Sequence, residues 1–252
     1  MSEIGYGYGS EWHLLRYLGY HRQALSAAVA ASTGASQVDW LDFPSDKRRR
    51  FLDAEWEGVG FLREPSRVLE AWGRFWPSSG SQQNWDAVGQ ASFPHGKEWL
   101  LVEAKAHVME MRSDCGAKGK GRLLIAESLD ATKKAMGAPG SCNWLEGHYQ
   151  YANRLAALHF LNTQGVKAHL VMIYFMGDRH SSASTTCPAS EQEWESVIQA
   201  AEKHLGMTGK SELEARIHKV FLPVCPGGAT HPLLRAATYG PRPVKEGSGS
   251  GT

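Results

Sequence analysis

The feature that most constrains the fold is a strand-like run that ends in an acid and a base. Residues 99–105 read Trp-Leu-Leu-Val-Glu-Ala-Lys, and the turn-like pair Gly96 and Lys97 comes shortly before them. The apolar start of this run is typical of a buried strand. Side chains alternate between the two faces of a strand, so we expect Glu103 and Lys105 on the same face. Burying charge is costly unless the charge is paired or binds metal. The acid and the base at this strand end are therefore candidate functional residues.

A second acid, Asp86, lies in a shorter strand-like run over residues 84–89. The segment 90–98 contains Pro94 and can turn the chain back, so we expect a hairpin that places Asp86 beside Glu103. Two adjacent carboxylates repel each other, and a divalent cation removes that repulsion. Oxygen ligands from carboxylates suit Mg²⁺ or Mn²⁺, so the pair predicts a site for one of these ions.

The pattern of Asp86, a gap, and then Glu103-Ala104-Lys105 resembles the PD-(D/E)xK nuclease superfamily, with Trp85 standing where a proline is common. The resemblance implies the restriction-endonuclease-like fold, an α/β fold with a central mixed sheet flanked by helices. It also implies metal-dependent hydrolysis of phosphodiester bonds, with Mg²⁺ or Mn²⁺ bound by Asp86, Glu103 and the carbonyl of Ala104. Lys105 would then orient or deprotonate a water, or stabilise the phosphate. DNA is the expected partner, because most of the superfamily acts on it.

Three glutamates are candidates for a further acid at this site. The resemblance implies a metal-side glutamate from a helix before the first strand, and Glu11 begins a helix expected over residues 11–31. An acid in the first turn of a helix also compensates the helix dipole, which explains Glu11 equally well. Glu55 and Glu57 are alternative sources of the acid, and the sequence does not choose among the three.

Two polar residues on a later helix are further candidates. Gln150 and Arg154 are four residues apart in a helix expected over residues 144–164, so they share one face. Some branches of the resembling superfamily carry a glutamine on this helix, with an aromatic more usual as its partner. The resemblance then implies Gln150 at the metal site and Arg154 on a phosphate. A polar helix edge without function is the alternative.

Local basic segments are the candidate surfaces for binding nucleic acid. Lys118 and Lys120 lie in a Gly- and Lys-rich segment, residues 113–122, which we expect to be a mobile loop that grips substrate. The basic run at residues 47–50 is either a phosphate contact or a solvated helix face. His107 shares the expected face of Glu103 and Lys105, where a strand-end histidine is more often simply hydrogen-bonded.

The rest of the chain predicts one α/β domain with additions. We expect helices over 66–75, 123–136 and 191–205 and strands over 38–44 and 167–175, with 212–220 open between a helix and an edge strand. We divide the chain into an N-terminal helical segment packed on the core (1–80), a nuclease-like α/β core with a C-terminal helix (81–224) and a loose tail with a linker (225–252).

Composition limits the classes of protein that the chain can represent. A formal net charge of +1 excludes a basic nucleic-acid coat. The four cysteines are scattered without a CxxC pair, which argues against zinc and favours reduced thiols in a cytoplasmic protein. The sequence shows no signal peptide and no stretch long enough to span a membrane, so we expect no membrane partner. A homodimer or a partner protein is compatible with the sequence.

Three functions compete on these observations. The first is an active metal-dependent nuclease, and the second is an inactive nucleic-acid-binding or protein-interaction module of the same fold. The third is a different α/β enzyme or protein-binding domain in which the acid–lysine pair is structural. Retention of Asp86, Glu103 and Lys105 together favours the first. The sequence leaves open DNA or RNA, single or double strands, cutting inside the strand or from an end, sequence specificity and oligomeric state.

Overall fold

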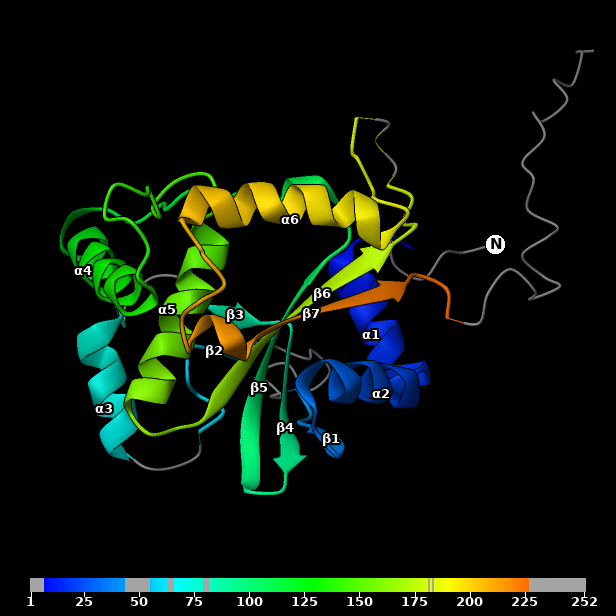
Figure 1. Ribbon diagram of the computed structural model, residues 1–252, viewed down its shortest axis with the longest axis horizontal. Coiled ribbons are helices and arrows are strands. Elements are labelled where there is room, and N and C mark those ends of the chain that lie inside the picture. The colour runs from blue at the N-terminus through cyan, green and yellow to red at the C-terminus, as the bar shows by residue number, and fades with distance from the viewer. Residues whose placement is uncertain are drawn as a thin grey trace, which may run out of the picture.

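A five-stranded sheet forms the centre of the protein, which we describe from a computed structural model (Figure 1). The structure describes residues 7–43, 55–62, 66–78, 82–180, 182 and 184–226. The strands run in the order β1 (Gln37–Trp40), β4 (Ala87–Phe93), β5 (Gly96–Lys105), β6 (Ala168–Met176) and β7 (Ile217–Pro223). The pairs β1–β4 and β4–β5 are antiparallel, whereas β5–β6 and β6–β7 are parallel. The expected α/β fold with a central mixed sheet is therefore confirmed at this level.

Helices cover both faces of the sheet (Figure 1). Helices α1 (Ser10–Tyr20) and α2 (Arg22–Thr33) pack on one face. The other face carries α3 (Ser66–Phe75), α4 (Gly119–Met136), α5 (Tyr149–Thr163) and α6 (Glu191–Leu205). Smaller elements complete the fold: a two-stranded sheet of β2 (Trp56–Glu57) and β3 (Asn84–Trp85), and the 3₁₀ turns η1 (Val108–Met111) and η2 (Glu214–Arg216).

Strand β5 lies between β4 and β6 and is buried on both faces. Its alternate residues Leu100 and Val102 pack with α1 and α2, whereas Leu101 packs with α5 and its neighbours. A strand covered on both faces reads as a continuous apolar run, which is why residues 99–102 show no polar alternation. Glu103 and Lys105 continue the face of Leu101, so both side chains point toward α5.

The expected hairpin between Asp86 and Glu103 forms, but its turn is shorter than predicted. Residues 90–98 were expected to turn the chain back, whereas β4 and β5 pair from Ala87 opposite Val102 to Phe93 opposite Gly96. Gly96 takes a φ of 125°, a backbone conformation that favours glycine, so a tight turn suffices. Asp86 interrupts the run between β3 and β4, and its own N–H donates to the Val102 carbonyl at 3.1 Å.

Several predicted elements have different limits in the structure. The helix expected over 11–31 is two helices, α1 and α2, because His21 between them leaves the helical conformation with φ −126° and ψ 28°. The helix expected from residue 144 begins at Tyr149, since Trp144 docks its indole N–H on the Leu205 carbonyl and Gly147 takes a φ of 79°. Helix α4 begins four residues before the predicted Leu123.

Other elements agree more closely with their predicted limits. Helix α6 has the limits expected for it, and the open segment 212–220 resolves into η2 followed by the parallel edge strand β7. The strand expected over 38–44 is β1, so part of the N-terminal segment belongs to the central sheet. The basic run 47–50 and the tail from residue 227 lie outside the described residues. Within the described part of the chain, no helix is both long and apolar enough to cross a membrane.

Candidate functional site

The centre of the site is the carboxylate of Glu103, which is buried and held by two cations. Glu103 is 1% exposed. Its Oε1 accepts from Lys105 Nζ, and its Oε2 accepts from Arg154 Nε at 2.7 Å. Burial by itself raises the pKa of Glu103, but the charges of Arg154 and Lys105 outweigh burial and hold that pKa below its ordinary value. Glu103 is therefore ionised inside the protein.

Lys105 joins Glu103 to the beginning of helix α5. The lysine is 6% exposed, and its Nζ also donates to Gln150 Oε1 at 2.9 Å. Gln150 is the second residue of α5, and its backbone N–H donates to Ser113 Oγ at 2.7 Å, which fixes the start of the helix beside the site. The predicted meeting of Glu103, Lys105 and Gln150 is thus present in the structure.

Arg154 lies one helical turn after Gln150 and also reaches the site, as the four-residue spacing predicted. Its guanidinium donates to Glu103, to the Asn84 carbonyl at 2.5 Å and to Asn153 Oδ1 at 2.8 Å. It also lies over the ring of Trp85, with 5.0 Å from the guanidinium carbon to the ring centroid. We expected Arg154 to contact a phosphate of the substrate, whereas its partners here are groups of the protein.

Asp86 is the second acid of the site. Its Oδ2 accepts a hydrogen bond from the Ala104 N–H at 2.6 Å, so the strand that carries Glu103 also positions Asp86. Burial, and then repulsion from the Glu103 charge, raise the pKa of Asp86 to about 8, although Lys105, the Ala104 N–H and Arg154 act in the opposite direction. Burial is the larger cause and the Glu103 charge adds to it, so a cation bound between the two carboxylates would lower the pKa of Asp86.

A cavity of about 400 Å³ opens beside Asp86 and Arg154. Polar side chains and two aromatic side chains form its wall between β3 and the beginning of α5. The described residues that line it are Glu55, Trp76, Gln82, Gln83, Asn84, Asp86, Ser113, Tyr149, Gln150, Asn153 and Arg154. Gln150 and Arg154 therefore belong both to the Glu103 network and to the cavity wall.

The three candidates for the further acid lie in different places. Glu55 lines the cavity next to Asp86. Glu57 is exposed in β2, where it pairs with Asn84 through the backbone. Glu11 is exposed in the first turn of α1, which packs on the opposite face of the sheet from the Glu103 side chain. Of the three, Glu55 alone lines the described cavity wall.

Lys118 and Lys120 do not belong to the described cavity wall. Both are exposed, and Lys120 lies in the first turn of α4, so the expected loop 113–122 is shorter than predicted. The beginning of this segment is fixed, because the Ser113 carbonyl accepts from the Tyr149 N–H at 3.0 Å. His107 contacts Glu110 at 3.1 Å, which supports its ordinary hydrogen-bonding role.

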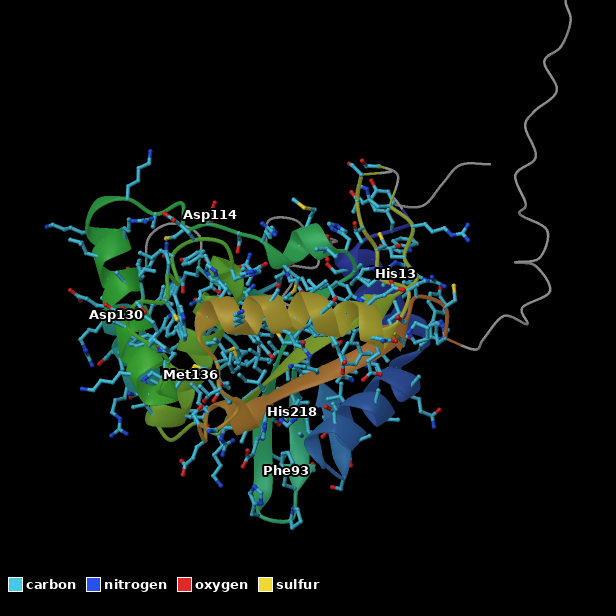
Figure 2. The ribbon with its side chains drawn as sticks, turned by 45° about the horizontal axis from the view of Figure 1, so that its top comes forward. His13, Phe93, Asp114, Asp130, Met136 and His218 are labelled. Carbon is cyan, nitrogen blue, oxygen red and sulfur yellow. The ribbon has the colours of Figure 1, made fainter. Side chains whose placement is uncertain are left out.

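A second ionic cluster lies at the other end of β5. Glu98 is 3% exposed and contacts Arg216 Nη1 at 2.9 Å and His169 Nε2 at 2.7 Å. Burial raises the pKa of Glu98, but these partners, Arg216 foremost, lower it to about 2. The rings of Phe93 and His218 both neighbour His169, and Figure 2 labels them at this end of the molecule. This cluster joins β5, β6 and β7 and is separate from the cavity.

The residues around Asp86 fit a divalent cation of the Mg²⁺ type in their chemistry but not in their present arrangement. Asp86, Glu103 and the Ala104 carbonyl offer oxygen ligands, which these ions prefer. The described residues contain no group of three or more His, Cys, Asp or Glu side chains arranged to hold a metal. Glu103 also has both oxygens engaged, so an ion here would displace Lys105 or Arg154 from one of them.

Comparison of the chain with known protein families, with curated proteins and with solved structures finds no match in any of the three. The case for a function therefore depends on the geometry of the site.

Sequence reasoning did not identify most of the cavity wall. Gln82 and Gln83 come directly before the strand that leads to Asp86, and Tyr149 and Asn153 flank Gln150 and Arg154. A consecutive Gln-Gln-Asn at 82–84, so close to a predicted acid, was the one available signal. Carboxamides are common in loops, however, so only the packing of α5 against β3 shows that they face one cavity.

The raised pKa of Asp86 predicts that replacing this acid stabilises the protein without metal. In the unfolded chain Asp86 ionises near its ordinary pKa, so between about pH 4 and 8 the folded chain binds more protons and loses stability as pH rises. Asp86→Asn removes this loss and keeps an oxygen for the Ala104 N–H. We expect a gain of about 2 kcal/mol in the free energy of unfolding at pH 7 in EDTA, measured by denaturant titration.

The same titration at pH 4 is the control for Asp86→Asn. Asp86 is protonated in the folded state there, so we expect the two proteins to differ much less than at pH 7. A variant less stable than the parent at pH 7 would contradict a raised pKa for Asp86.

Proposed function

We propose that the protein is a divalent-metal-dependent nuclease that hydrolyses phosphodiester bonds, with DNA as the first substrate to test. The observation that carries the proposal is the convergence of two carboxylates, a lysine and a glutamine at one strand end beside a cavity. The mixed sheet, with β5 and β6 joined by the segment that contains α5, is compatible with the fold that the Asp86…Glu103-Ala104-Lys105 pattern implies.

The proposed roles follow from the contacts of each side chain. Asp86, Glu103 and the Ala104 carbonyl would hold Mg²⁺ or Mn²⁺, which would supply positive charge at the phosphate and make an attacking water easier to deprotonate. Lys105 places its ammonium beside Glu103, where it can donate hydrogen bonds to a phosphate oxygen as negative charge develops. Gln150 positions Lys105 through the bond to Nζ, and Arg154 holds Glu103 in place.

One observation favours a second candidate, a binding module of the same fold without catalysis. Both oxygens of Glu103 are engaged by cations of the protein, and a closed buried ion pair of this kind is stable without a metal. In that case the cavity would bind a ligand, and the ion network would only hold β5 to α5.

A cleavage assay separates the two candidates. Supercoiled plasmid, linear duplex, and single strands of DNA and RNA are incubated with the protein in Mg²⁺, Mn²⁺ or EDTA, and products are resolved on gels. We expect cutting in metal that EDTA abolishes and that Glu103→Gln removes. The absence of both Mn²⁺ binding and cutting would favour the binding module, in which the ion network is structural, whereas calorimetric Mn²⁺ binding without cutting of any of these substrates would point to an untested substrate or a missing partner.

The affinity for Mn²⁺ is expected to depend on pH through Asp86. A metal competes with the proton for this carboxylate, and burial together with the Glu103 charge raises its pKa to about 8. Below pH 8 the affinity should therefore fall by about tenfold for each unit of pH, and above pH 8 it should level off. Calorimetric titrations of Mn²⁺ at pH 6, 7 and 8 measure this slope, and a constant affinity over this range would show that Asp86 is not a ligand.

A further inference from the structure

The cavity beside Asp86 has a wall that is poor in cations and rich in carboxamides. Its described lining contains five carboxamide side chains, at positions 82, 83, 84, 150 and 153, and a single cation, Arg154. That guanidinium already donates to Glu103 and to the Asn84 carbonyl. A groove that follows a phosphate backbone is lined with Lys and Arg, so this cavity does not have the character of such a groove.

Three of these carboxamides have a hydrogen-bonding group without a partner among the described residues. Gln83 is 1% exposed; its Nε2 donates to the Asn153 carbonyl at 3.3 Å, and its Oε1 is buried without a partner among the described residues. A buried acceptor without a donor is costly, so it marks a place where a ligand can supply one. Among the described residues, Gln82 and Gln150 each bond through the oxygen alone, accepting from Trp72 Nε1 and Lys105 Nζ, so their NH₂ groups have no partner there.

Donors and acceptors of this kind match the edge of a nucleobase. Carboxamides offer one acceptor and two N–H donors in a plane, the geometry with which Asn and Gln read bases. The aromatic side chain of Tyr149, which is partly exposed, and that of Trp76, which is almost fully buried, line the same wall. Burial raises the pKa of the Tyr149 hydroxyl, so this group stays a neutral hydrogen-bonding group at physiological pH. Protein sites that hold an unstacked base combine these two elements.

The volume of the cavity restricts what can enter. About 400 Å³ lies in the lower part of the range for small-ligand pockets, roughly 300–1,000 Å³, and suits a single nucleotide. A base inside a duplex is stacked and paired, so it must leave the stack before it can enter a pocket between β3 and α5. The cavity therefore fits an unpaired or extrahelical base.

We propose that this cavity binds one unpaired nucleobase next to the phosphate that Lys105 would contact, so that single-stranded or extrahelical nucleotides are the substrate class. This inference rests on the proposed nuclease function for the position of the phosphate, but binding of the base can be tested separately. Gln83 is the central hydrogen-bonding residue, with Gln82 and Gln150 beside it and Trp76 as part of the wall.

Binding is tested without any cleavage. The deoxynucleoside 5′-monophosphates of adenine, guanine, cytosine and thymine are titrated by calorimetry into the protein in EDTA, and deoxyribose 5-phosphate is the ligand without a base. We expect at least one nucleotide to bind at least tenfold more tightly than the sugar phosphate. Equal affinities, or no binding of any nucleotide, would overturn the proposal.

Two variants test whether the cavity is the cause of the tighter binding of nucleotides than of deoxyribose 5-phosphate. Gln83→Met keeps the length of the side chain and removes its polar groups, and Gln82→Met makes the same change at a partly exposed position that tolerates substitution better. Each is expected to weaken nucleotide binding at least tenfold and to leave the weak binding of deoxyribose 5-phosphate unchanged. Gln37→Met, on the exposed edge strand β1, is the matched control and should bind as the parent does. Unchanged nucleotide affinity in both folded cavity variants would place the base elsewhere.

A cleavage experiment distinguishes failure of this inference from failure of the nuclease function. Single-stranded DNA and a strand of the same length that is abasic at every position are compared in Mn²⁺. We expect the abasic strand to be cut at least tenfold more slowly. Equal cutting of both strands would refute the base site while the nuclease stands. Nucleotide binding with no cutting of either strand would refute the nuclease while the base site stands.

Discussion

Replacing Lys105 with methionine is expected to lower metal-dependent cleavage by about 10³-fold, or about 4 kcal/mol in the activation barrier. The ammonium of Lys105 is placed between Glu103 and Gln150, and methionine fills its volume without a charge or a donor. A charge that acts on the developing negative charge of the phosphate contributes more in the transition state than in the substrate complex, so the loss should appear in kcat. Single-turnover cleavage of a labelled strand in Mn²⁺ measures it.

The control for this prediction must separate chemistry from folding. The side chain of Lys105 is 6% exposed and is one of two partners of Glu103, so its replacement can destabilise the fold as well as slow the chemistry. Circular dichroism melts of Lys105→Met show whether the variant is folded at the assay temperature. Lys97→Met, at the exposed turn of the β4–β5 hairpin, is the matched substitution and should keep full activity. A folded Lys105→Met protein that cuts within a few-fold of the parent would exclude Lys105 from the chemistry.

The parts of the fold that could be predicted are those with a strong local pattern. The apolar run that ends in Glu103 and Lys105 defines β5, because a strand covered on both faces needs no polar residue until it ends. Ser190 accepts from the Glu193 N–H at 3.3 Å as the N-cap of α6, and Gly206 follows its end in a left-handed conformation. Local chemistry of this kind sets where an element begins and ends.

Elements that depend on distant contacts could not be placed from the sequence. Residues 144–148 begin with the apolar pair Trp144 and Leu145, which a helix could bury, yet the Trp144 indole N–H donates to the Leu205 carbonyl at the end of α6 instead. Likewise, nothing near Glu55 in the sequence shows that it lines the cavity of Asp86, while Glu11, with the clearer helical context, lies on a helix of the other layer. Proximity of this kind is decided by how layers pack, which the local pattern does not contain.

The contacts of Arg154 within the site likewise could not be predicted from the local sequence pattern. The four-residue spacing from Gln150 predicted correctly that both side chains face the site. It did not predict that Arg154 pairs with Glu103, because a charged group near a presumed phosphate site is readily assigned to the phosphate. Burying the ionised Glu103, which is 1% exposed, is costly unless cations of the protein pair with it. Arg154 on α5 supplies the second of these cations, after Lys105.

Removing that cation is expected to destabilise the fold strongly. Arg154→Met leaves one oxygen of the buried Glu103 carboxylate unpaired and deprives the Asn84 carbonyl and Asn153 Oδ1 of their donor. Breaking one side of a buried ion pair lowers the free energy of unfolding by about 3–5 kcal/mol, because the remaining charge is left uncompensated. Denaturant titration at pH 7 in EDTA measures the loss, and Arg74→Met, on the exposed side of α3, should change stability by less than about 0.5 kcal/mol.

A double-mutant cycle then shows whether the loss comes from the charge of Glu103. Glu103→Gln in the Arg154→Met background removes the uncompensated charge, so the double variant should recover part of the stability that Arg154→Met loses. In the parent background the same Glu103→Gln change should destabilise, since it leaves Arg154 and Lys105 without their shared acid. If Glu103→Gln had the same effect in both backgrounds, Arg154 and Glu103 would be uncoupled, and the ion pair could not be what holds α5 to the end of β5.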